Sequence, residues 1–421
     1  SAYTYSYATM GEMFAWTVGW ALVMEYAIAA AAVAVGWSGY FSGTVLHQLL
    51  GIDLPAWLQA GPLALGGAEG GFINLPAVVI SLVVTALLVL GTSESAKVNA
   101  AEVMIKVVAL VVFVMITLPK IRSAEFSPFL PAGAFGGFGT GVGAVGAAAT
   151  IFFAYVGFDA VSTAAEETRN PQRNVPIGLI GSLLFCTLVY VLVAAGAIGT
   201  VGGQPIFGPD GIPFETGSAE LARQCGLPKY SGALVCSNEA LAFVLREIGF
   251  SRMGNLLGFA AFFALPSVIL VLLYGQTRIF FVMARDGLLP EKLASVHPRW
   301  KTPHVVTIIT GLAVAIGAAF LPVGQLADIS NAGTLYAFLM VAIAVMVLRR
   351  NYPLRERKFK VPLVWLVAPL TVFGCIFLFL NLPKAAMVFF PVWTAVGMVI
   401  YVLYSRHNSH LARGSVEVHE L

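Results

Sequence analysis

Long apolar segments alternate with short polar ones along most of the chain. An α-helix rises 1.5 Å per residue, so about 20 apolar residues cross the roughly 30 Å hydrocarbon core of a bilayer. Such segments occur near 13–45, 73–91, 98–119, 144–165, 175–200, 256–284, 304–321, 332–348, 361–381 and 385–404. The pattern predicts an all-α polytopic membrane protein with about ten spans. An even number of spans places both termini on the same side of the membrane.

The segment at 150–176, TIFFAYVGFDAVSTAAEETRNPQRNVP, departs from the plain apolar pattern. It begins as an apolar helix and then carries Gly157 and Asp159 at membrane depth, before a charged loop. A charge inside a span costs about 3 kcal/mol on insertion scales. A helix opened near a glycine frees backbone groups that can hold a small zwitterion. The residues alone also allow a glycine packing contact and an acid tucked near the helix end.

Two further charged residues fall within predicted spans. Glu25 lies in the middle of the first span, between mostly apolar residues, and a buried carboxylate needs a partner or a proton. Lys106 lies eight residues beyond Val98, which is about 12 Å into the membrane and deep for a lysine that must reach the interface. Each residue is either a structural contact or part of a transport mechanism.

Composition narrows the class of protein. Of the 421 residues, 58% are hydrophobic and 11% are charged, and the formal net charge is +3. A soluble domain carries about 25% charged residues. The chain has no basic tract dense enough for nucleic acid, and no HExxH pair, Cys/His ligand cluster or Walker loop. We therefore expect no nucleic-acid partner, no metal, no cofactor and no enzymatic activity.

The distribution of basic residues and cysteines predicts the orientation. Most of the 24 lysine and arginine residues fall in loops on the side of the two termini, which places both termini in the cytoplasm. Cys225 and Cys236 lie in the largest loop on the opposite side, with ten residues between them. Outside the cytoplasm they either pair as a disulfide or remain two free thiols.

Four stretches then resemble a known family in the same order. The stretch FFAYVGFDAVSTAAEETRNPQRNVPIG is similar to the sixth span and following loop of amino-acid permeases of the APC superfamily, most closely their cationic amino acid transporter branch. The others are QTRIFFVMARDGLLP (276–290), PRWKTPHVVTIITG (298–311) and GTLYAFLMVAIAVMVLRRNYPLRERKFKVP (333–362). The resemblance implies a LeuT-like inverted-repeat fold of 12 spans.

The start of the chain also resembles this family, in which a stretch like SAYTYSY follows the second span. The resemblance therefore implies that about 10 of the 12 spans are present. It further implies a permease transmembrane domain at 1–404, lacking its first two spans, and a short cytoplasmic tail at 405–421.

The resemblance also implies a function and a site. It indicates a secondary active transporter of cationic or small neutral amino acids, working by alternating access in the plasma membrane. Backbone carbonyls of Phe153, Ala154 and Val156, beside Gly157, would bind the substrate ammonium, and Asp159 would be a structural or gating acid. Phe153 would shield the substrate, unless it is simply a core or lipid-facing aromatic.

The resemblance also implies which ion drives transport. Some relatives of this family hold a sodium ion in the bundle, and proton-coupled permeases place the ammonium of a lysine from their fifth span at the same site. Lys106 corresponds to that lysine in the order of spans. Glu25-Tyr26 is similar to a glutamate–tyrosine pair of the third span. A lysine removed from water releases its proton more easily, which favours proton coupling.

The alternative to a transporter is a non-transporting or inactive accessory chain, because the first substrate-binding span is absent. The specific amino acid, symport versus exchange and the oligomeric state stay open.

Overall fold

The computed structural model describes residues 2–63, 71–91, 96–158, 170–209, 211–214, 219–230, 232–354 and 360–410. Within these ranges the chain is helical, apart from loops and one isolated bridge between Phe207 and Pro213. The α-helices are α1 (Ala2–Met10), α2 (Glu12–Tyr40), α3 (Ala56–Gln59), α4 (Leu75–Leu90), α5 (Ala96–Thr117), α6 (Gly143–Ile151), α7 (Pro171–Val201), α8 (Ala219–Cys225), α9 (Ala240–Glu247), α10 (Ser251–Arg285), α11 (His304–Phe320), α12 (Val323–Asn351), α13 (Val364–Leu380), α14 (Lys384–Ile400) and α15 (Arg406–Asn408).

Short segments of other helix types extend or connect these elements. Wider π-helical turns continue α2 over Phe41–Leu50 and α14 over Tyr401–Ser405. The 3-10 turns are Leu118–Lys120, Ser123–Phe126, Phe152–Tyr155, Pro228–Tyr230, Leu234–Cys236 and Glu291–Ala294.

The ten predicted spans each contain a described helix. Among the described residues, six helical segments are long and apolar enough to cross a membrane: Glu12–Leu50, Ala100–Lys120, Pro171–Val201, Ser251–Arg285, Val323–Asn351 and Lys384–Asn408. Four shorter apolar helical segments account for the rest: Leu75–Leu90, Gly143–Tyr155, His304–Phe320 and Val364–Leu380. The apolar pattern therefore located the helices, while their ends differ from the predicted boundaries.

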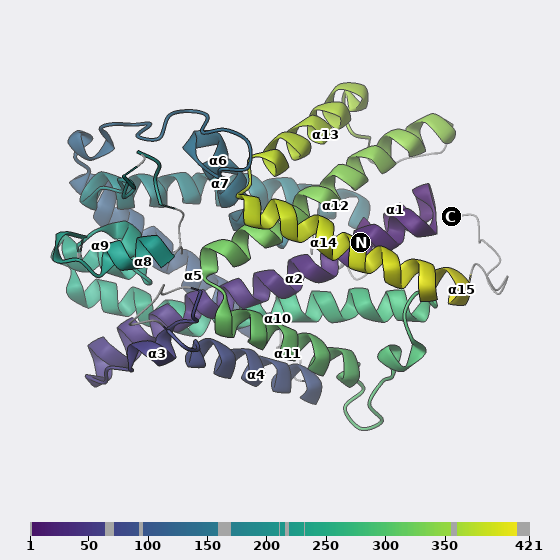
Figure 1. Ribbon diagram of the computed structural model, residues 1–421, viewed down its shortest axis with the longest axis horizontal. Coiled ribbons are helices and arrows are strands. Elements are labelled where there is room, and N and C mark those ends of the chain that lie inside the picture. The colour runs from purple at the N-terminus through teal and green to yellow at the C-terminus, as the bar shows by residue number, and fades with distance from the viewer. Residues whose placement is uncertain are drawn as a thin grey trace.

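Helix α2 lies at the centre of the molecule and is the most deeply buried of the six long segments (Figure 1). It packs against α1, α4, α10, α11, α12 and α14. Its middle is the alanine-rich run at 27–36, and Ala29, Ala30 and Ala31 have no exposed surface. Small residues let membrane helices approach closely, which explains why this span can be surrounded on all sides.

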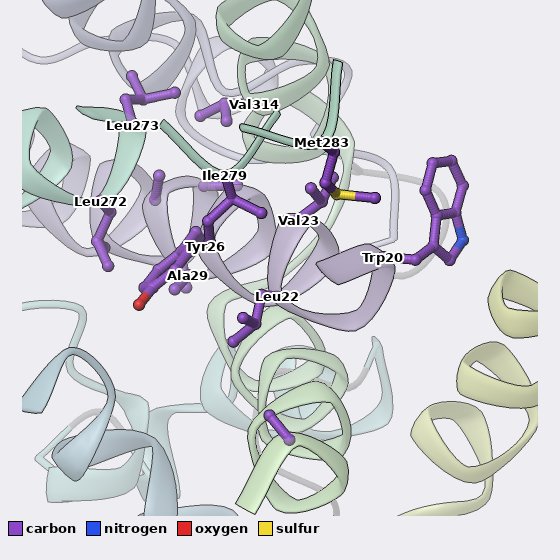
Figure 2. Packing of buried hydrophobic residues seen from close by; sticks show 14 of the residues in the cluster. Trp20, Leu22, Val23, Tyr26, Ala29, Leu272, Leu273, Ile279, Met283 and Val314 are labelled. Carbon is purple, nitrogen blue, oxygen red and sulfur yellow. The ribbon is translucent and has the colours of Figure 1, made fainter. Parts of the chain in front are cut away.

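The apolar core forms where α2 meets α10 and α11. In Figure 2, Val23 and Tyr26 of α2 lie near Ile279 and Met283 of α10, with Val314 of α11 above them. All five side chains are buried. Because lipid is as apolar as these residues, their contacts stabilise the fold through close packing rather than through removal of water.

Helix α12 begins nine residues before the predicted start at 332, at Val323. The early part of this helix contains Asp328, Ser330 and Asn331. These polar residues interrupt the apolar pattern, so the predicted start lies too far along the chain. All three side chains are buried in the structure. A polar residue in a span usually faces the interior of the bundle, and here Ser330 bonds to α2 and Asn331 to α6.

The two ends of the bundle differ in what they contain. Figure 1 shows α1 and α15 at one end and α3, α8 and α9 at the other. Residues Ser405–His410, which belong to the predicted tail, are packed against the turn after α10 rather than extended into solvent. Ser405 Oγ donates to the carbonyl of Leu288 (2.6 Å), and the amide of His410 donates to the carbonyl of Asp286 (3.2 Å).

Candidate substrate site at a broken helix

The helical segment that carries the predicted site is broken in the structure. Helix α6 ends at Ile151, and a single 3-10 turn over Phe152–Tyr155 follows. The backbone then becomes extended at Val156 (φ −59°, ψ 133°) and turns at Gly157, whose φ is +97°. Residues with a side chain rarely adopt such a φ, so glycine at this position permits the turn. The backbone is therefore not a continuous helix here, as predicted, while Asp159 lies outside the described residues.

The last carbonyls of α6 are bonded by a side chain from another helix. A helix end leaves its final carbonyls without intrahelical donors. Asn331 Nδ2, on α12, donates to the carbonyls of Ala149 (3.0 Å) and Thr150 (2.8 Å). Hydrogen-bond donors that water would supply elsewhere thus come from a neighbouring span.

Two of the three carbonyls predicted to bind substrate, those of Phe153 and Ala154, already have protein partners. The hydroxyl of Tyr190, on α7, donates to the carbonyl of Ala154 (2.7 Å). The amide of Val156 donates to the carbonyl of Phe153 (3.0 Å), closing the turn. A carbonyl oxygen has two lone pairs, so each retains capacity for one further donor such as an ammonium.

The side chains around the break are mostly aromatic and aliphatic. Phe153 and Val156 are half-buried and pack against the central core, and Ala154 is exposed. Phe152 and Phe158 both meet the ring of Phe338 on α12 edge-on, at centroid distances of 6.0 and 5.2 Å. The described surroundings are therefore suited to an apolar group more than to a charged one.

Glu25 is fully buried on α2, where α2 and α12 come into close contact. A Cβ added at Gly333 would lie 3.1 Å from the carbonyl oxygen of Ala21 and 3.2 Å from the Cβ of Glu25, so the absence of a side chain allows this approach. Ser330 Oγ donates to the carbonyl of Glu25 (3.2 Å). Ser330 and Asn331 are neighbours on α12. One bonds to the backbone of Glu25 on α2 and the other to the broken end of α6, so α12 contacts both.

Lys106 is joined to a different part of the bundle. It is half-buried on α5, and its Nζ donates to Ser267 Oγ of α10 (2.8 Å). Ser267 in turn donates to the carbonyl of Ala264 (2.9 Å). This ammonium is therefore held between α5 and α10, whereas the break of α6 is held by α7 and α12.

Three residues of this arrangement were missed by reasoning from the sequence: Tyr190, Ser267 and Asn331. Asn331 carried a usable signal, since a polar amide in an otherwise apolar span needs partners. Ser267 and Tyr190 carried none, because hydroxyl groups in spans often bond to their own helix. Their partners are far away in the chain, as with Asn331 and Ala149, 182 positions apart.

A separate cavity of about 540 Å³ lies at the end of the bundle that holds α3, α8 and α9. Its wall includes Glu239 and Arg246, which form an ion pair, and Thr44 donates a hydrogen bond to Glu239. Cys225 and Cys236, which also line it, are joined as a disulfide. Within the described ranges, no three His, Cys, Asp or Glu side chains gather as a metal site would require.

Comparison with known proteins assigns the chain to a family. A sequence model described as amino acid permease matches residues 1–404. The chain belongs to the amino acid permease family. The permease is thus a multi-pass integral membrane protein of a transporter family, and not an enzyme. Its APC membership agrees with the resemblance seen in the four sequence stretches.

Individual relatives place the permease more finely within the family. It is 41% identical over 413 residues to a branched-chain amino acid permease of Bacillus subtilis (strain 168), covering 98% of this chain and 80% of the relative. It is 37% identical over 411 residues to a methylthioribose transporter of the same organism, again covering 98% and 80%. The vacuolar cationic amino acid transporter 4 of Arabidopsis thaliana is 33% identical over 351 residues, or 83% of this chain and 52% of the relative.

These sequence identities favour a different branch of the family from the cationic branch that the four stretches suggested. The two bacterial proteins match the permease more closely, and over more of its length, than this cationic amino acid transporter does. The cationic transporters are the more distant relatives.

Proposed function

We propose that this protein is a secondary active transporter of branched-chain or similar apolar amino acids. The similarity to a branched-chain amino acid permease over nearly the whole chain carries this proposal. The aromatic and aliphatic residues around the break support it, because binding pockets match apolar ligand groups with apolar walls. The broken helix would bind the ammonium and carboxylate common to all amino acids, and the surrounding side chains would select the apolar group.

We further propose that the chain adopts the LeuT-like inverted-repeat arrangement and moves substrate by alternating access. Under this proposal α5 and α10 correspond to the fifth and eighth spans of the family, and Lys106 supplies a cation between them. Its hydrogen bond to Ser267 supports that role. Transport would then be coupled to protons, with Glu25 contributing to the buried polar network. The plasma membrane is the proposed location, with both termini in the cytoplasm.

Uptake into proteoliposomes tests the proposed substrate class. The purified full-length protein is reconstituted, and uptake of labelled leucine, isoleucine, valine, lysine, arginine and methylthioribose is measured under an inward proton gradient. We expect saturable uptake of the three branched-chain amino acids, each inhibited by the other two. Uptake confined to lysine and arginine would contradict the proposal.

Methylthioribose is the second candidate substrate, because a methylthioribose transporter is 37% identical over 98% of this chain. Uptake of methylthioribose without any amino acid would favour it over the first proposal. Absence of uptake for every solute, with correctly inserted protein, would favour a non-transporting accessory chain.

A further inference from the structure

The break in α6 leaves backbone carbonyls that a membrane cannot satisfy. Ala149 and Thr150 belong to the last turn of α6, where carbonyls have no donor four residues further on. In the hydrocarbon region water is scarce, so such groups must be bonded by the protein. The stability of the broken conformation therefore depends on whichever donors reach these two atoms.

Asn331 donates to both carbonyls, and that of Thr150 also accepts from the backbone amide of Phe152. A side-chain amide carries two N–H groups, and Asn331 Nδ2 lies 3.0 Å from the carbonyl oxygen of Ala149 and 2.8 Å from that of Thr150. The side chain has no exposed surface. The amide is therefore out of contact with bulk water at this position.

The backbone around Asn331 is itself fixed to the central helix. Its neighbour Ser330 donates to the carbonyl of Glu25 on α2, and Gly333 brings α12 into close contact with Ala21 and Glu25. The amide is thereby presented by a helix that packs along the most buried span of the bundle. A small shift of α12 relative to α2 would move both donors away from α6.

We infer that Asn331 is a positioning residue that holds the end of α6 in its substrate-binding conformation and couples the movement of α6 to that of α12. This inference rests on the proposed function, because it assigns a role at the proposed amino-acid site. Asn331 acts through the backbone of α6. Loss of its donors lowers the fraction of molecules in which the break is correctly formed.

The expected effect on transport follows from that population shift. Apparent affinity falls in proportion to the competent fraction, whereas the rate of the loaded transporter changes less. Asn331→Leu keeps a similar shape and removes both donors. We expect this variant to raise KM for leucine about tenfold while kcat changes less than about threefold.

Asn381 provides a matched control. It is also fully buried, and its Nδ2 also donates to a backbone carbonyl, that of Phe377 (2.8 Å), but it lies after α13. Asn381→Leu is expected to leave KM unchanged. An equal rise of KM in both variants would show a general packing defect and would overturn the inference.

A labelling measurement separates this inference from the proposed substrate. Ala154 lies in the broken segment and is exposed. In a background with Cys186 and Cys375 replaced by serine, Ala154→Cys reports on this segment through its rate of reaction with a maleimide, whether or not leucine is transported. We expect the rate to change several-fold with Asn331→Leu and not with Asn381→Leu. An unchanged rate with Asn331→Leu would overturn the inference, and lack of leucine uptake by the parent would overturn only the proposed function.

A second variant covers the case in which Asn331→Leu does not fold. Asn331→Asp has nearly the same shape, and its carboxyl group can donate one hydrogen bond when protonated but none when ionised. The labelling rate at position 154 should therefore approach that of the parent as pH falls, and depart from it as pH rises. Because maleimide reacts with the thiolate, the variant is compared with the parent at each pH, and a rate equal to that of the parent at every pH would contradict the inference.

Discussion

At the scale of single residues, the least expected contact is that of Lys106. The sequence placed a lone lysine deep in an apolar helix, and the structure gives its ammonium a hydroxyl partner, Ser267, on α10. The Ser267 hydroxyl accepts a hydrogen bond from the ammonium. This contact holds the charged group between α5 and α10, which is the position that the proposed coupling requires.

Replacing Lys106 by alanine should remove accumulation driven by a pH gradient, while exchange of substrate across the membrane continues. The reason is that the change of charge linked to the transport cycle is lost, whereas the residues around the break are untouched. Uptake in proteoliposomes with an imposed pH gradient, with and without sodium, measures this. Lys120→Ala is the matched control, because Lys120 lies at the exposed end of the same segment and contacts Phe250. Equal pH-driven uptake by Lys106→Ala and the parent would disprove the role.

Tyr3 is a second informative residue, at the end of the bundle near α1. Its hydroxyl donates to Asp286 Oδ2 (2.8 Å), and only 2% of its surface is exposed. Burial, together with the neighbouring Asp286 carboxylate, raises the pKa of Tyr3 above its ordinary value of 10.0. The phenol therefore remains a donor throughout the physiological range.

Replacing Tyr3 by phenylalanine should destabilise the protein by about 1–3 kcal/mol at pH 7, because a hydrogen bond to a charged acceptor is lost. The contribution of Tyr3 should be constant below pH 10 and decline above it, since the unfolded tyrosine ionises there while the folded one does not. Thermal unfolding in detergent at pH 7 and pH 11 measures both effects. A destabilisation by Tyr3→Phe that is equally large at the two pH values would argue against this assignment.

At the scale of elements, the broken helix depends on one glycine and on two side chains from neighbouring helices. Gly157 permits the turn, Asn331 bonds the end of α6 and Tyr190 bonds the 3-10 turn. The glycine acts through its backbone conformation and not through tight packing, because a Cβ added there would meet nothing within 4 Å. Any side chain at this position should therefore alter the shape of the break without causing a clash.

Gly157→Leu should abolish transport while the protein remains in the membrane. A residue with a side chain held at this φ costs about 1–3 kcal/mol, which favours rearrangement of the break. Gly249→Leu is a suitable control: Gly249 has a φ of +89° and equally open surroundings, but lies between α9 and α10. Leucine uptake and membrane content are measured for both variants. Normal uptake by Gly157→Leu would show that this turn is not part of the substrate site.

At the scale of the whole molecule, the two ends of the bundle have distinct chemical character. Figure 1 shows α1 and α15 at one end and α8 and α9 at the other. The second end also holds the disulfide, the Glu239–Arg246 ion pair and the cavity. A disulfide persists in an oxidising compartment. This feature and the distribution of basic residues favour the same orientation, with the disulfide outside.

Cysteine labelling in intact cells tests the orientation. In a background with Cys186 and Cys375 replaced by serine, Lys229→Cys should react with a membrane-impermeant maleimide and Lys292→Cys should not. Both side chains are exposed, so accessibility to the reagent depends on the side of the membrane. Permeabilised cells, in which both positions should react, provide the control. The reverse pattern would invert the assigned topology.

The sequence by itself determined the features that depend on local physics. Apolar segments long enough to cross a bilayer located the helices, and a glycine followed by an acid marked where the helix at α6 could open. It placed the start of α12 too late, because Asp328, Ser330 and Asn331 are polar yet buried between helices. It also favoured the cationic branch, whereas the bacterial relatives match the chain more closely.

Only the tertiary structure decided which groups form hydrogen bonds to the broken end of α6 and to the buried charged residues. Asn331, Tyr190 and Ser267 were assigned by contacts between helices that lie far apart in the chain. Likewise, α2 became the central helix because alanine and glycine allow several neighbours to approach it at once. Helix formation in a membrane follows from the length and polarity of each segment alone. The partner of a buried polar group depends instead on how the helices pack, which no single segment specifies.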